Sequence, residues 1–340
     1  MKRILLLSFL LFITASSFAS NKICVGENIV VVFNEDLKKL TVHDKESLEI
    51  KQSTELEGSV FGEIALSHDE SKIWFEIDGV MYARDLETGE IVKNIQGSNV
   101  YKFELSAAMD YLIHFEMMEN DALVYVYDLN TAEAVSYAKI AFTDFLETIH
   151  FDAQKQQLHL LSKRFTSETE KPSKEPVFGL PSSVEEIALD FRNDGLASRY
   201  FVYDIANKQE LYNEVISYSP DFGCNFEVID ERLFIVTAIG TAEVQEDFSL
   251  KLTPLVAMNV VDYAVFRSDL IGITGFNLFS YSVETGTYKE WNDDKANLIL
   301  IQSKGLAVSE TDYYFMMEGV FYRAKRSEPL NIDADMPIDN

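Results

Sequence analysis

The sequence predicts an all-β fold made of seven copies of one four-stranded unit, and three observations lead to this prediction. The stretch Lys72–Ile95 contains three short runs of β-branched and aromatic residues, separated by Asp78-Gly79 and by the polar segment Asp85–Gly89. Such a pattern is typical of adjacent antiparallel strands. The pattern recurs along the chain. Its period is about 40 to 45 residues, the length that four strands of one propeller blade require.

The copies align on Asp85, where one strand ends and a polar tight turn begins. The intervals between successive copies are 41, 43, 76, 43, 35 and 43 residues, and the long interval contains an insertion. We therefore predict a seven-bladed β-propeller with four-stranded antiparallel blades and a turn between the third and fourth strands of each. The predicted turn positions are Asp44, Asp85, Asp128, Asp204, Asp247, Ser282 and Lys325.

A second recurring element precedes several of the second strands. It is a polar turn, present at Leu66–Lys72, Leu105–Asp110 and Val308–Asp312. These turns resemble the Ser-Pro-Asp-Gly turn of YVTN, WD40-like and TolB-type propeller repeats. The resemblance covers nearly the whole chain and implies an architecture, not an activity. The Trp-Asp dipeptide and the Tyr-Val-Thr-Asn tetrad are absent. A large β-sandwich or a solenoid is the alternative all-β fold.

The first 19 residues have the features of a secretory signal peptide. Lys2 and Arg3 precede an apolar run from Ile4 to Thr14, and Ser17-Phe18-Ala19 matches a small-x-small cleavage site. No later run is long and apolar enough for a membrane helix. We expect a soluble, exported protein, periplasmic or extracellular, with one propeller domain over residues 20–332 and an acidic tail over residues 333–340.

The charge is strongly negative. Removal of Lys2 and Arg3 changes the formal charge from −27 to −29. A protein that binds the phosphate backbone of nucleic acids needs a basic surface. The acidic charge therefore excludes nucleic acid as a partner bound in this way. Docking on anionic lipid is disfavoured for the same reason. The acidity indicates solubility and a monomer, or a preference for a basic protein partner or divalent cations.

The insertion, residues 166–197, lies within the fourth blade and starts as a polar, proline-bearing loop. Ser183 and Glu186 then form a capping-box pattern that predicts a short helix. Val184, Ile187 and Phe191 follow at helical spacing on one face. That apolar face is expected either to pack on the protein's own propeller or to dock a partner.

No motif predicts a catalytic, cofactor or metal site. The sequence contains no Gly-x-Ser-x-Gly elbow, no phosphate-binding loop and no zinc-ligand spacing. The two cysteines, Cys24 and Cys224, suggest a disulfide in an oxidising compartment. However, the repeat register places them in the first and fifth blades. A bridge needs Cα atoms within about 7 Å, so it would require the N-terminal strand to leave its blade.

Two function classes remain open from the sequence. The first is a non-catalytic scaffold that binds a protein or small ligand through loops at the channel mouth or through the insertion. The alternative is a propeller-type enzyme or dehydrogenase subunit whose site is assembled from scattered loop residues. Few strand-forming residues follow Lys325, so we also predict that the segment Asn21–Val25 completes the last blade, because an unpaired edge is a liability.

Overall fold

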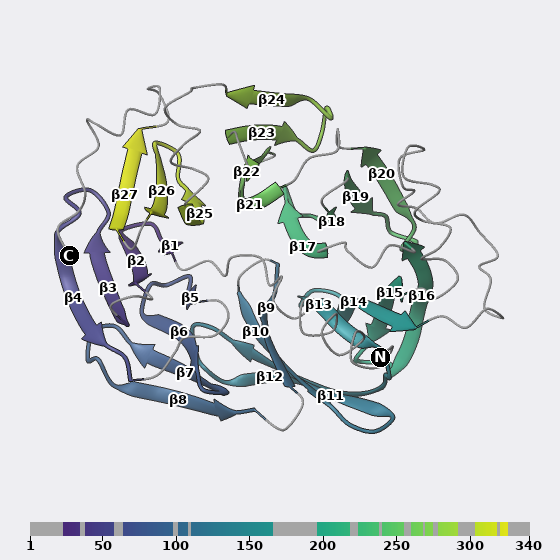
Figure 1. Cartoon of the computed structure of the whole chain (residues 1–340). Helices are drawn as coiled ribbons and strands as arrows, with labels where there is room; N and C mark the ends of the chain where they lie inside the picture. The colour runs from purple at the N-terminus through teal and green to yellow at the C-terminus, as the bar shows by residue number, and fades with distance from the viewer. Residues whose placement is uncertain are drawn as a thin grey trace, which may run out of the picture.

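The computed structural model describes residues 23–34, 38–57, 64–97, 101–107, 110–165, 196–217, 224–237, 240–254, 260–267, 269–274, 278–291, 303–317 and 320–325. All regular elements in these residues are β-strands. They form six four-stranded sheets and, among the described residues, one three-stranded sheet. Every strand pairs antiparallel with its neighbour. Figure 1 shows the sheets arranged in a ring, which confirms the seven-bladed propeller.

Each blade is a contiguous stretch of chain. Blade 1 contains β1 (Ile23–Val25), β2 (Ile29–Asn34), β3 (Lys39–Asp44) and β4 (Ile50–Glu55). Blade 2 contains β5 (Ala65–Leu66), β6 (Lys72–Ile77), β7 (Val80–Asp85) and β8 (Ile91–Gln96). Blade 3 contains β9 (Tyr101–Leu105), β10 (Tyr111–Met117), β11 (Asp121–Asp128) and β12 (Ala134–Ala141). Blade 4 contains β13 (Phe145–Asp152), β14 (Gln157–Phe165), β15 (Leu196–Asp204) and β16 (Gln209–Ser217).

The remaining blades follow the same order. Blade 5 contains β17 (Cys224–Ile229), β18 (Arg232–Thr237), β19 (Gly240–Val244) and β20 (Leu250–Pro254). Blade 6 contains β21 (Val260–Phe266), β22 (Asp269–Thr274), β23 (Leu278–Ser282) and β24 (Tyr288–Trp291). Blade 7 contains β25 (Ser303–Val308), β26 (Asp312–Met317) and β27 (Val320–Lys325). The first strand of each blade lies toward the centre of the ring in Figure 1, and we call these the inner strands.

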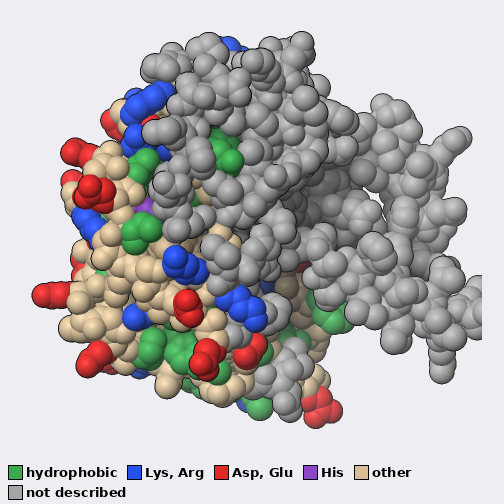
Figure 2. Space-filling view, turned by 60° about the vertical axis from the view of Figure 1, so that its left-hand side comes forward, with side chains coloured by type: hydrophobic (Ala, Val, Ile, Leu, Met, Phe, Trp, Pro, Cys, Tyr) green, Lys and Arg blue, Asp and Glu red, His purple; other side chains and the backbone are tan. Residues whose placement is uncertain are grey.

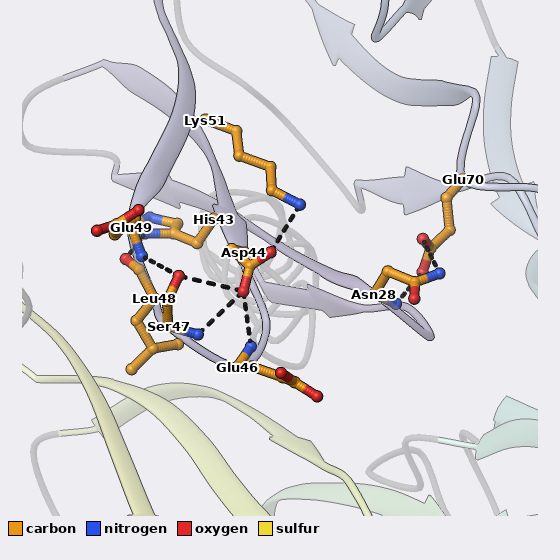
Figure 3. A network of polar contacts seen from close by, with 9 residues as sticks. All are labelled: Asn28, His43, Asp44, Glu46, Ser47, Leu48, Glu49, Lys51 and Glu70. Carbon is orange, nitrogen blue, oxygen red and sulfur yellow. Dashed lines mark hydrogen bonds and ion pairs between the residues drawn. The ribbon is translucent and has the colours of Figure 1, made fainter.

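All seven predicted turn positions end a third strand or lie in the turn that follows it. The aspartates close these turns with their side chains, as Asx turns do. Asp44 Oδ1 accepts hydrogen bonds from the backbone N–H of Glu46 at 3.0 Å and of Ser47 at 2.9 Å (Figure 3). Lys51 also contacts this carboxylate, and these donors hold the pKa of Asp44 below its usual range. The repeated aspartate is therefore a turn residue.

The fourth residue after the aligned position has a left-handed backbone in five of these turns. Its φ is 61° at Leu48, 73° at Gly89, 60° at Ala132, 55° at Lys208 and 66° at Gly286. Glycine adopts this conformation without the clash that a Cβ introduces. Two turns have glycine at this position, and the other three carry a side chain despite the strain.

Replacing Lys208 with glycine should therefore raise the free energy of unfolding by about 1 kcal/mol, because Lys208 is exposed and its side chain contributes little else. Urea denaturation of the variant measures the change. Glu87→Gly is the control, since Glu87 lies exposed in the equivalent turn of blade 2 without a positive φ. We expect Glu87→Gly to destabilise the protein. A loss of stability in Lys208→Gly would contradict the strain argument.

The core lies between blades. One cluster joins Ile113 and Phe115 of blade 3 to Ile149 and Leu160 of blade 4, all buried. Another joins blade 1 to blade 2 through Phe33 and Phe75. The second strands are apolar on both sides because each sheet packs against two neighbours.

The prediction that the N-terminal segment completes the last blade is wrong. Residues 23–25 form β1, which pairs with β2 as the inner strand of blade 1, with Cys24 opposite Val31. Apolar side chains instead close the ring. Ile23 and Val32 of blade 1 pack with Tyr314 and Phe321 of blade 7. We call this boundary the seam.

The two cysteines lie in the predicted blades. Cys24 is in β1 and its thiol donates a hydrogen bond to the Ile64 carbonyl at 3.0 Å. Cys224 begins β17, and its side chain lies outside the described residues. Their pairing stays a prediction. Among the described residues, no helix is long and apolar enough to span a membrane.

Candidate functional site

The predicted docking residues Val184, Ile187 and Phe191 lie outside the described residues, so the docking hypothesis remains untested. The structure does show where their segment leaves the blade. It connects β14 to β15, which are the second and third strands of blade 4. Because strands alternate in direction, these connections and the links between blades share one face of the ring. We call it the insertion face.

The strand pairing reveals where the inner strands differ from one another. In each blade one inner-strand residue faces the third residue of the second strand. Four blades have a small residue there: Cys24, Ala65, Ala264 and Ala307. Blades 3, 4 and 5 instead have Glu104, His150 and Glu227. These three consecutive blades therefore differ from the others, because they have a polar side chain where the other four have a small one.

Glu104 belongs to a charged group between blades 3 and 4 that we call the inner-strand cluster. It consists of Lys102, Glu104, Glu147, Thr148 and Lys163. The Lys102 ammonium lies 2.7 Å from Glu104 Oε2, and Thr148 donates a hydrogen bond to Glu104 Oε1 at 3.1 Å. Lys102 also donates to the Glu147 carbonyl. Lysine and glutamate are equal in number here, so the cluster is close to neutral.

Glu147 is an enclosed carboxylate of this cluster, with 13% of its side chain exposed. The pairing of β13 with β14 skips it between Leu146 and Thr148, which marks a β-bulge. Bulges change the direction of a side chain and recur beside binding sites. Its Oε1 lies 2.6 Å from the Lys163 ammonium, while its Oε2 is buried without a hydrogen-bond partner among the described residues. Burial raises the pKa of Glu147, although Lys163 opposes the change. The bulge therefore places an acceptor oxygen that can receive a donor.

A second ionic group lies near the base of the insertion. Asp144 accepts hydrogen bonds from Ser162 at 3.1 Å and from Arg199 at 3.4 Å. Arg164 approaches the same carboxylate at 3.9 Å. These residues lie at the insertion-face ends of β13, β14 and β15, so this face of blade 4 is rich in charged side chains.

Glu227, in the inner strand of blade 5, has a different environment. The Tyr263 hydroxyl, from the inner strand of blade 6, donates a hydrogen bond to Glu227 Oε1 at 2.9 Å. Among the described residues, no lysine or arginine forms an ion pair with this carboxylate. Its desolvation raises the pKa of Glu227 to about 7. Glu227 therefore changes its charge near neutral pH.

The histidines are not arranged as an accessible site. His43, His114, His150 and His159 are buried, and His68 lies exposed in a turn of blade 2. His150 and His159 face each other across β13 and β14, with ring centroids 5.8 Å apart. Ser106 Oγ lies 2.9 Å from His150 Nδ1, but both side chains are enclosed by protein. Among the described residues, no three potential ligands gather as for a metal ion.

Apolar side chains are exposed on the outer strands of blades 2 and 3. Ile91 and Val92 of β8 and Val135 and Tyr137 of β12 are each about half exposed. Figure 2 shows such apolar patches between charged side chains of both signs on the visible, described part of the surface. The outer edge of the ring therefore offers apolar contact area, on strands that the second and third strands of each blade separate from the inner strands.

Comparison with known proteins supports the fold and nothing finer. No family model matches the chain, and no curated protein does so. Among solved structures, a functionally unknown protein from Desulfotomaculum acetoxidans has 14% sequence identity and a TM-score of 0.55, covering 88% of this chain and 93% of that one. The dihydro-heme d1 dehydrogenase NirN has 12% identity and a TM-score of 0.50, covering 95% of this chain and 76% of that one.

Proposed function

We propose that the protein is an exported, non-catalytic β-propeller that binds a protein or a small ligand at the inner strands of blades 3 to 5. One observation carries this proposal. The inner-strand residue that faces the third residue of the second strand is small in four blades and polar in these three. The unsatisfied Glu147 Oε2 adds support, because buried acceptors usually have a donor. Among the described residues, the one close serine–histidine pair is enclosed, which favours binding over nucleophilic catalysis.

An enzyme or a dehydrogenase subunit is the second candidate, and the likeness in fold to NirN supports it. In that case a redox group such as heme would need ligands. Four of the five histidines are inside blades, so His68 is the exposed histidine among the described residues. Adding heme to the purified protein and recording the absorption spectrum tests this candidate. A bound-heme spectrum would favour it over the scaffold.

Affinity purification of the tagged, exported protein tests the proposed function. The wild type is compared with the double variant Lys102→Met/Glu104→Gln, and Glu133→Gln in an exposed turn of blade 3 is the control. Co-purifying proteins, small molecules and metals are identified by mass spectrometry. We expect one partner or ligand to be retained by the wild type and by Glu133→Gln but lost from the double variant. The same set with all three proteins would contradict a site on the inner strands.

A further inference from the structure

Blade 3 contains a complete ammonium–carboxylate site made from its own residues. Lys102 and Glu104 are two residues apart on β9, so their side chains lie on the same side of the strand. The Lys102 Nζ lies 2.7 Å from Glu104 Oε2. A hydroxyl from the inner strand of the next blade, that of Thr148, donates to the other carboxylate oxygen at 3.1 Å. One carboxylate thus holds one ammonium and one hydroxyl.

Blade 5 repeats this arrangement without the ammonium. Glu227 occupies the position of Glu104, since each faces the third residue of its second strand. Tyr263, from the inner strand of the next blade, supplies the hydroxyl at 2.9 Å. The residue at the position of Lys102 is Asn225, which has no charge. The cation that completes the group in blade 3 is therefore not supplied by the corresponding residue in blade 5.

We infer that Glu227 accepts an ammonium group from a ligand, in the place that Lys102 Nζ occupies beside Glu104. This inference rests on the proposed binding role of the inner strands and names its ligand chemistry. A primary ammonium can come from a small diamine or from the lysine side chains of a basic polypeptide. The formal charge of −27 favours either source, because a strongly anionic protein attracts cations over a long range.

The surroundings of Glu227 fit this assignment. Glu227 is partly buried, and its desolvation by the surrounding protein raises its pKa to about 7. Tyr263 is the titratable side chain in contact with it among the described residues. The neighbouring Phe226 faces the buried, neutral His150 of blade 4. Arg232, beside the β17–β18 turn, lies over the ring of Phe234, the residue that faces Glu227, but its guanidinium pairs with Glu243 at 3.6 Å. An incoming ammonium therefore has no competing cation among these groups.

The test measures binding of putrescine and of tetralysine to the full chain at pH 8 by calorimetry, with acetylated forms of both as uncharged controls. We expect at least one probe to bind the wild type and Glu133→Gln equally. Glu227→Gln should weaken binding at least tenfold. Asn225→Lys should do the same, because the new ammonium occupies the site. Tetralysine binding alone would identify a basic polypeptide as the source, and putrescine binding a small amine.

The pH dependence provides a second readout. Binding to the wild type should weaken about tenfold between pH 8 and pH 6, as Glu227 is protonated, and this dependence should disappear in Glu227→Gln. No binding by either probe, or equal losses in Glu227→Gln and Glu133→Gln, would overturn the inference. The proposed function is tested separately. If Lys102→Met/Glu104→Gln still loses its co-purified partner, the proposed function stands although the ammonium site is wrong; if the partner is retained, both are wrong.

Discussion

We expect acidification from pH 7 to pH 4 to destabilise the fold through the buried histidines of blade 4. His150 is 5% exposed, and its Nδ1 accepts a hydrogen bond from the Ala107 N–H at 3.2 Å, so protonation at Nδ1 would oppose this donor. Burial lowers the pKa of His150 from 6.5 to about 4. The unfolded chain binds more protons between these values, so this contribution is complete above pH 6.5 and decreases as the pH falls. It amounts to about 3 kcal/mol.

His159 acts in the same direction. It is 4% exposed, Tyr200 contacts its Nδ1 at 2.6 Å, and burial keeps its pKa well below the usual value. Glu227 has the opposite effect, since its raised pKa favours the folded state on acidification. For this reason the measurement compares variants at several pH values.

Urea denaturation between pH 7 and pH 4 measures the effect. His150→Asn keeps an acceptor near the position of Nδ1 and removes the titrating group. Its stability should therefore fall with pH by about 3 kcal/mol less than that of the wild type. His68→Gln is the matched control, because His68 is exposed. If the stability of His150→Asn depended on pH in the same way as that of the wild type, the buried imidazole would not control acid stability.

Removing Lys163 should be the most destabilising single change in the inner-strand cluster. Its side chain and that of Glu147 are each 13% exposed, and 2.6 Å separates the ammonium nitrogen from the carboxylate oxygen. Lys163→Met leaves an enclosed carboxylate without its cation, which costs about 3–5 kcal/mol in comparable pairs. Replacing both partners, as in Lys163→Met/Glu147→Leu, should restore most of the loss because no uncompensated charge remains.

Lys155→Met is the control for this experiment. Lys155 is 62% exposed and lies 3.6 Å from Asp152, so the pair is a surface pair and its removal should change stability by less than about 1 kcal/mol. Urea denaturation at pH 7 compares all four proteins. Equal effects of Lys155→Met and Lys163→Met would contradict the view that Glu147 is enclosed and depends on Lys163.

The sequence was sufficient to predict the number of blades and, to within three residues, the position of every third-strand end. Turn chemistry is local, and the aspartate at positions such as Asp85 and Asp128 bonds to backbone groups only two or three residues away. The period between these turns then determines the blade count. Ring closure was not predictable in this way. The segment that forms β1 could pair with β2, which follows it directly in sequence, or with blade 7 at the other end of the chain, and turn chemistry does not distinguish these two pairings.

The candidate site was also missed. Lys102, Glu104, Glu147 and Glu227 are ordinary charged residues in a chain with 56 acidic ones, and proximity in sequence cannot select among them. Lys102 approaches Glu147 only because two blades meet, and Lys163 approaches it because β14 pairs with β13. One signal was available. Aligning the inner strands as well as the third strands would have shown alanine at positions 65, 264 and 307 where Glu104 and Glu227 stand.

The seam has a consequence for how the ring comes apart. Every other pair of neighbouring blades is joined by the polypeptide itself, whereas blades 1 and 7 adhere through side chains and through Arg323, which donates to the Glu46 carbonyl at 3.3 Å. Within the part of the chain that the structure describes, separating them breaks no covalent link and no ladder of paired strands. The ring can thus open at the seam while each blade stays folded. The packing of Phe321 and Tyr314 against blade 1 opposes this opening.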